Sequence, residues 1–137
     1  MSDWNADLDA IGVLVADALA ALAPTLVVER GWRNYSNLGK GELPRLFLFD
    51  PRSTERALQF AQAEVTSTYK GELWADTTQV VLGTWRLAIV AAVAADPTLR
   101  GAAKRFRLVT SAVLETYPGA KDDRRVLTLD FSSLVVE

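Results

Sequence analysis

The carboxylates are the side chains of this sequence best able to do chemistry, because its 137 residues include neither histidine nor cysteine. That absence excludes the commonest general base, the commonest transition-metal ligand, thiolate zinc sites and thiol nucleophiles. Carboxylates could still act as acid and base, or bind magnesium or calcium. Asp7 and Asp9, however, lie two positions apart at a helix start and cannot face each other. Asp122-Asp123 adjoins two arginines in a predicted turn, where we expect local ion pairs.

Nucleotide-binding and nucleophile motifs are missing from the chain, which contains no Walker A, G-x-G-x-x-G or G-x-S-x-G pattern. Gly39-Lys40-Gly41 alone does not form a phosphate-binding loop. The other glutamates and aspartates are scattered in unlike contexts. We therefore predict that the chain is not an enzyme, with no catalytic residue, no metal site and no cofactor. A carboxylate-dependent enzyme is the third of three functional hypotheses.

A basic cluster is formed by Arg100, Lys104, Arg105 and Arg107, on a helix predicted over residues 98–116. Three of them, Arg100, Lys104 and Arg107, have the i, i+4, i+7 spacing of one helix face. A solvated face is the default interpretation, because no aromatic side chains interleave with the charges as a single-strand binding platform requires. The net charge of −2 also gives no general attraction to nucleic acid. We expect no sequence-specific nucleic-acid binding. If this face is functional, the alternatives are contact with nucleic acid or, with at least equal weight, with an acidic partner surface.

The four tryptophans are a generous supply for this length. Trp85 belongs to an alternating apolar segment and is expected in the core, whereas Trp32 and Trp74 lie in loop-like surroundings. Aromatic side chains exposed on loops are favoured at protein interfaces. The alternative is that these loops fold back and cap the core. The candidate interface residues are Trp32, Arg33, Tyr35, Leu38, Lys40, Phe60, Tyr69, Trp74, Arg100, Lys104 and Arg107.

Composition indicates one soluble globular domain spanning residues 1–137, with 50% hydrophobic and 23% charged residues. The first residues lack the basic start and apolar run of a signal peptide. The apolar stretch over 87–95 has nine residues, and a membrane span needs about twenty. We expect no membrane segment.

The first half of the chain predicts one helix and two strands. An apolar periodicity of three and four residues predicts a helix over 7–22, ended by Pro24. A short strand is expected over 25–30 and a loop over 31–42. After Pro44, the apolar run 45–49 is typical of a buried strand.

Residues 53–77 allow two interpretations. One is a helix over 55–63 followed by a strand over 65–69. The other, which we favour, is a long β-hairpin that projects as a polar arm poorly buried by its own domain.

The second half of the chain predicts a long strand over 78–94 from its alternating pattern, although its alanines permit a helix. The helix over 98–116 would end at Pro118-Gly119, and a last strand would cover 124–136. The predicted fold is α+β, a mostly antiparallel sheet of four to five strands with two helices packed on one face. The element order is α-β-β-(β)-β-α-β.

In order and spacing these elements resemble the tail terminator, or tail completion, proteins found at the neck of tailed bacteriophages and of phage-derived particles. The resemblance spans nearly the whole chain. It is carried by the opening helix, the Pro-led strand Leu43-Pro44-Arg45-Leu46-Phe47-Leu48-Phe49, the polar arm, and the segment Trp85-Arg86-Leu87-Ala88-Ile89-Val90-Ala91-Ala92-Val93. Related tube and connector-stopper proteins of the tail and neck share this architecture.

The resemblance implies a structural protein of the virion that is assembled in the host cytoplasm. It implies a homo-oligomeric ring, a hexamer, that ends the tail tube and docks it to the head connector. The partners would be other copies of the chain, the tail tube protein and the head–tail connector or stopper protein. The arm would strap a neighbour, and the loop over 32–41 would make an axial contact. The alternatives are another tail or neck component, or a small dimeric module that binds a ligand or partner.

Overall fold

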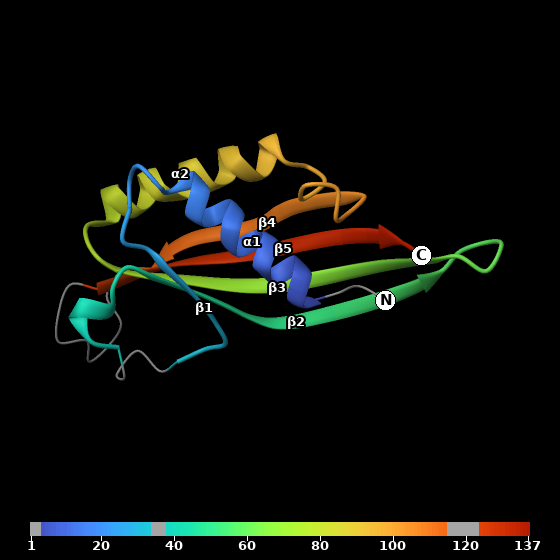
Figure 1. Cartoon of the computed structure of the whole chain (residues 1–137), viewed down its shortest axis with the longest axis horizontal. Helices are drawn as coiled ribbons and strands as arrows, with labels where there is room; N and C mark the ends of the chain where they lie inside the picture. The colour runs from blue at the N-terminus through green and yellow to red at the C-terminus, as the bar shows by residue number, and fades with distance from the viewer. Residues whose placement is uncertain (1–3, 34–37, 115–123) are drawn as a thin grey trace.

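Two helices and five strands make up the part of the chain that the computed structural model describes, residues 4–33, 38–114 and 124–137 (Figure 1). A short 3-10 helix lies between the first two strands. In chain order the elements are α1 (Trp4–Ala18), β1 (Val27–Arg30), η2 (Lys40–Glu42), β2 (Arg45–Ala57), β3 (Ala63–Asp76), α2 (Gln79–Ala95), β4 (Arg105–Leu114) and β5 (Arg124–Val136).

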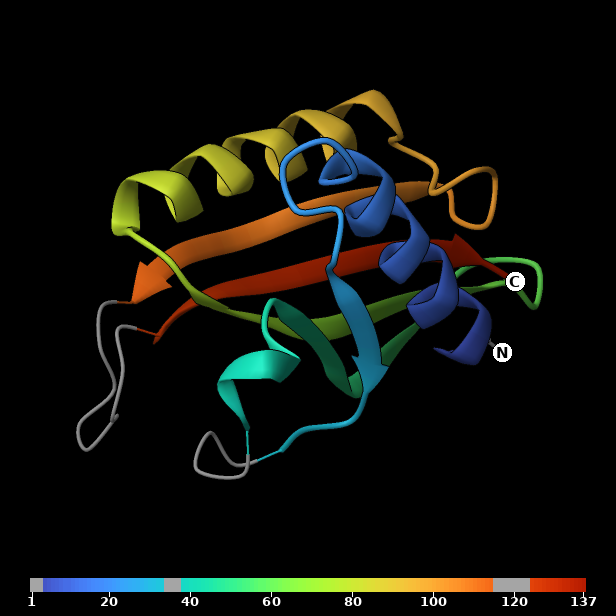
Figure 2. The same cartoon turned by 60° about the vertical axis from the view of Figure 1, so that its left-hand side comes forward.

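The strands form one sheet in the order β1-β2-β3-β5-β4. β1 runs parallel to β2, and every other neighbouring pair is antiparallel. Both helices cover the same face of this sheet (Figure 2). The predicted fold class, a mostly antiparallel α+β sheet with two helices on one face, is therefore confirmed.

The main core lies between the helices and the sheet. Alternate residues of β3 face the helices, as the period of a strand requires, and Tyr69 and Leu73 are fully buried there. Ile11 of α1 and Ile89 of α2 pack into the same cluster. Each fully buried side chain of this size contributes about 1.5–3 kcal/mol through apolar burial.

A smaller core occupies part of the opposite face of the sheet. Phe47, Trp74 and Val126 are buried there beneath Leu38 and Leu43, which precede β2. Sheet faces that carry large apolar residues need such a cover, and the segment 38–44 supplies it. The predicted strand over 45–49 is present but continues to Ala57 as β2.

The largest correction concerns residues 78–94, which form helix α2 and not a strand. The alternating pattern was misleading because alanines fit either period. The buried residues Leu82, Trp85, Ile89 and Val93 follow helical spacing. Thr78 caps the start of the helix, since its side chain accepts a hydrogen bond from the Val81 amide at 3.2 Å.

The helix predicted over 98–116 is also wrong. Leu99, Arg100 and Gly101 all have positive φ and form a turn, and the chain then enters strand β4. A register shift between Leu108 and Thr110 disturbs the two-residue alternation that would have marked this strand. The observed order is therefore α-β-β-β-α-β-β. Pro118-Gly119, the predicted helix stop, and Asp122-Asp123, the predicted turn, lie outside the described residues.

The hairpin favoured for residues 53–77 is confirmed, and the alternative helix over 55–63 is wrong. β2 and β3 pair from Arg45 with Trp74 to Ala57 with Ala63, around a single shift after Phe49. The expectation of a poorly buried arm holds for the outer half of β2, which is exposed over residues 52–57. It does not hold for β3, which lies in the middle of the sheet and buries Val65 and Ser67. The final strand matches its prediction, whereas α1 spans Trp4–Ala18 and β1 is shortened to Val27–Arg30.

Candidate interface surfaces

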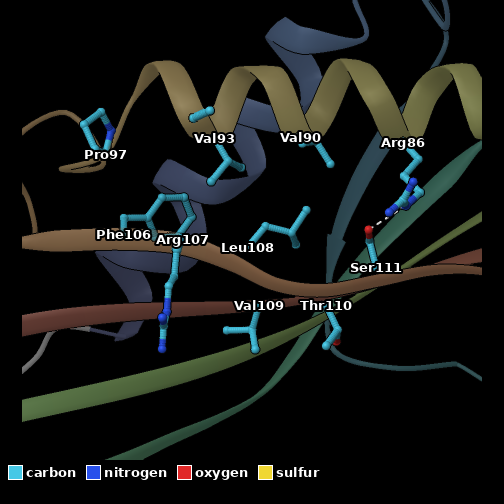
Figure 3. A pocket seen from close by; sticks show the side chains of 11 residues that line it. Arg86, Val90, Val93, Pro97, Phe106, Arg107, Leu108, Val109, Thr110 and Ser111 are labelled. Atoms are coloured by element: carbon cyan, nitrogen blue, oxygen red, sulfur yellow. Dashed lines mark hydrogen bonds between the residues drawn. The ribbon is translucent and has the colours of Figure 1, made fainter.

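A groove of about 570 Å³ lies between α2 and the edge strand β4 (Figure 3). Val90 and Val93 of α2 line one wall, and Phe106 and Leu108 of β4 point towards them. Arg86 crosses one end of the groove, where its Nε donates to the Ser111 hydroxyl at 2.7 Å. The groove is thus apolar along its walls and polar at its end, which suits an amphipathic protein segment.

Helix α2 is apolar on its outward side as well as its inward side. Arg86 is the single charged residue between Gln79 and Ala95. Val80 is 80% exposed and Leu87 is 63% exposed, and Val90 is partly exposed beside the groove. Helices that are hydrophobic all round are normally buried on every side. The outward side of α2 is therefore an exposed apolar surface.

Two sheet edges are open in the described part of the chain. β4 is the last strand of the sheet and no described strand pairs with its outer edge. At the other side, β1 pairs with β2 over Arg45–Leu48, so the outer half of β2 has no described strand on the edge that faces away from β3. Open edges are the usual sites of strand pairing between chains.

The tip of the β2–β3 hairpin carries the most exposed large apolar residue of the described chain. Phe60 is 91% exposed, and the tip extends past the helices (Figure 1). Phe60 and Ala61 have φ of 61° and 60°, and the Gln62 amide donates to the Gln59 carbonyl at 3.4 Å. Two successive left-handed residues are typical of a type I′ turn, which normally uses asparagine and glycine. A phenylalanine here is costly to the isolated chain.

A second groove, of about 340 Å³, lies between α1 and β1. Val13 and Val28 line it together with the ion pair formed by Asp9 and Arg30. Arg30 also donates to the Asn5 side chain at 2.9 Å. The two charged side chains that line this second groove, Asp9 and Arg30, are therefore paired within the chain. The exposed arginines on β4 beside the first groove form no ion pair with the described residues.

The predicted basic helix face is not formed, because its members lie on different elements. Arg100 is in the turn after α2 and pairs with Asp17 at 3.0 Å, and Lys104 lies exposed just before β4. Arg107 is exposed on β4 and borders the α2–β4 groove. β4 instead places Arg107 two residues from Arg105 at one end of the groove, and Arg86 of α2 lies at the other end (Figure 3).

The loop aromatics differ in their exposure. Trp32 is 54% exposed, and its indole donates to Glu72 Oε1 at 2.9 Å. Trp74 is buried on β3, where its indole reaches the same oxygen at 3.4 Å, so its assignment to a loop is wrong. Leu38 and Tyr69 are also buried in the chain. These three side chains support the fold and do not reach the surface.

Arg33 helps to hold the covering segment 38–44 against the smaller core. Its guanidinium lies over the Phe47 ring, 5.7 Å from the centroid, and it pairs with Glu29 at 3.0 Å and Glu42 at 3.3 Å. The Gly39 amide donates to Glu42 at 2.9 Å. That backbone hydrogen bond and, secondarily, the charges of Arg33 and Arg45 lower the pKa of the Glu42 carboxyl from 4.5, against a smaller opposing effect of burial.

Two further candidates cannot be placed as side chains. Tyr35 lies outside the described residues, and Lys40 begins η2 but its side chain is likewise not described. Within the described ranges no group of three or more acidic residues could hold a metal ion. In the same ranges no helix is long and apolar enough to cross a membrane.

The sequence analysis did not predict the exposed apolar side of α2, nor the position of Arg105 and Arg107 on a strand beside it. A signal was present, since residues 87–95 are apolar without a single charge. The alternating pattern instead predicted a long strand over 78–94. A helical interpretation would have required a partner for its outer side.

Comparison with known proteins shows which solved structures share this fold. No protein-family model matches the sequence, and no curated protein matches it significantly. Among solved structures, a chain from the virion of a native gene transfer agent particle matches with a TM-score of 0.51 and 12% identity, over 95% of this chain and 94% of that one. A second is the bacteriophage SPP1 gp17 protein, with a TM-score of 0.42 and 12% identity over 96% and 94%. The chain thus shares the fold of a virion component over nearly its whole length.

Proposed function

We propose that this protein is a structural subunit of a phage tail or neck, in a phage or a phage-derived particle. It assembles into a ring, a hexamer, that ends the tail tube and docks it to the head connector. The observation that carries the proposal is the fold shared end to end with a component of the gene transfer agent virion. The protein acts within the virion after assembly in the host cytoplasm.

The surfaces of the chain suit a ring. A ring whose subunits meet head to tail needs two different and complementary patches on each copy. The chain has an apolar groove beside β4 and an exposed apolar tip on the β2–β3 hairpin, on different parts of the molecule. Its open sheet edges also lie on opposite sides of the sheet. These features support contacts between copies more than a site within one copy.

The remaining partners would be the tail tube protein and the head–tail connector or stopper protein. Trp32 is the loop aromatic available for such an axial contact, because Glu72 holds its indole while half of its surface stays exposed. The proposal includes no cofactor, no catalytic residue and no sequence-specific contact to nucleic acid.

Negative-stain images of the purified chain test this function. We expect rings of uniform diameter with a central opening. Long stacked tubes would instead favour a tube protein of the same virion. Discrete dimers without rings would contradict the proposal and favour a small dimeric binding module.

A further inference from the structure

We propose that neighbouring copies are joined by the hairpin tip of one copy, residues 59–62, inserted into the α2–β4 groove of the next. The inference rests on the proposed ring and names the contact that builds it. Phe60 is the anchor and the apolar groove walls are its receptor.

The tip is built as a knob. Phe60 has almost no contact with its own chain, being 91% exposed, and it occupies a left-handed conformation that large side chains disfavour. A strained residue persists where its position is used. The paired strands that carry it extend back into the central sheet, so the knob is held on a rigid stem.

The groove is built as a receptor. Val90, Val93, Phe106 and Leu108 give it apolar walls, and its volume of about 570 Å³ accommodates an aromatic ring with part of the turn around it. It also lies along the unpaired edge of β4, where backbone groups are available to an added segment. Nothing in the described chain fills it.

Charge complementarity selects a second copy as the occupant. Arg105 and Arg107 are exposed on β4 and form no ion pair with the described residues, and Arg86 is bound to Ser111 alone. The hairpin near Phe60 carries Glu55 and Glu64, which likewise form no ion pair within the described chain.

One cation, Arg56, faces Glu64 across the hairpin. The tip is therefore net acidic, with two carboxylates against one guanidinium. The charged residues that line the groove are Arg86 and Arg107, with Arg105 two residues before Arg107 on β4, and no acidic residue lines it. Opposite charges at the two patches favour this register of docking over tip-to-tip or groove-to-groove contacts.

Site-specific cross-linking tests the contact, and the absence of native cysteine makes every introduced thiol unique. The double variant Ala61→Cys/Ala94→Cys places one thiol beside Phe60 and the other in the α2–β4 groove. The matched control, Ala61→Cys/Val13→Cys, places the second thiol in the α1–β1 groove. Both are treated with a short bismaleimide, and the mass of the untreated assembly is measured in parallel.

We expect a ladder of cross-linked multimers up to the closed ring for the first variant, at least about tenfold above the control. Rings that form without this preference would overturn the tip–groove contact and leave the ring intact. Cross-linking that stops at reciprocal dimers would support the contact and refute the ring. A chain that stays monomeric and uncross-linked at every concentration would refute both.

Discussion

The hydroxyl of Tyr69 on β3 donates a hydrogen bond to the carboxylate of Asp7 in the first turn of α1. Both residues are buried, and 62 positions of sequence separate them. The bond fixes the first helix on the middle of the sheet. It also explains why Tyr69, expected at an interface, works inside the chain.

Tyr69→Phe is expected to lower the free energy of unfolding by about 1–3 kcal/mol. The substitution keeps the ring and removes one donor from a buried carboxylate, and a hydrogen bond lost to a buried charged group is costly. Urea unfolding measures the change. An unchanged free energy of unfolding in Tyr69→Phe would contradict a specific role for the hydroxyl.

Glu42→Gln is expected to destabilise the chain at neutral pH and to have little effect in acid. The Gly39 amide, with Arg33 and Arg45, lowers the pKa of the folded Glu42 carboxyl below 4.5. A lowered folded pKa gives stability that is present above the ordinary value and is lost as the pH falls through the folded one.

Melting temperatures of the two proteins should therefore differ at neutral pH and converge below 4.5. Glu55→Gln is the control, since Glu55 is exposed and forms no ion pair within the described chain. A constant difference across this range would show that the Glu42 charge is not involved.

Phe60→Asn is expected to weaken assembly without lowering the stability of the isolated chain. Asparagine tolerates the left-handed conformation, so the isolated chain should be about 0.5–1 kcal/mol more stable or unchanged. Assembly should need at least about tenfold more protein, because the anchor is lost. Leu22→Asn, at another exposed apolar position, should leave assembly unchanged; equal weakening by both variants would refute a specific anchor.

Two charge-reversed variants that each fail to assemble alone should form rings when they are mixed. Arg105→Glu/Arg107→Glu makes the groove rim acidic, and Glu55→Lys/Glu64→Lys makes the tip basic. Each variant alone would juxtapose like charges and assemble poorly. Mixed in equal amounts, they should form rings of alternating copies, seen by light scattering. Failure of the mixture, with both chains folded, would contradict the charge pairing.

Much of the fold could be predicted from local patterns. The opening helix, the strand after Pro44 and the last strand have clean periodicity, and the hairpin composition favoured strands. Two segments were misassigned for opposite reasons. Alanines in α2 satisfied a strand period that the burial of Leu82, Trp85 and Ile89 does not follow. In β4 the shift between Leu108 and Thr110 disturbed a real strand period.

The candidate site was harder to predict, because its parts meet only in three dimensions. The hairpin turn lacks the glycine or asparagine that normally marks it, so Phe60-Ala61 gave no turn signal. The groove joins residues from α2 and β4, two segments whose predicted secondary structures were exchanged, so Arg86 was assigned to a strand and Arg107 to a helix. Exposure of Phe60 and of the outer side of α2 becomes visible only in the folded chain.

Native mass spectrometry of the purified chain, over a range of protein concentrations, tests the central claim most directly. Each copy contributes 15.0 kDa. A closed ring predicts one dominant species at six times this mass, with intermediates that vanish as the concentration rises. A dominant dimer that does not grow at the highest soluble concentration would contradict it.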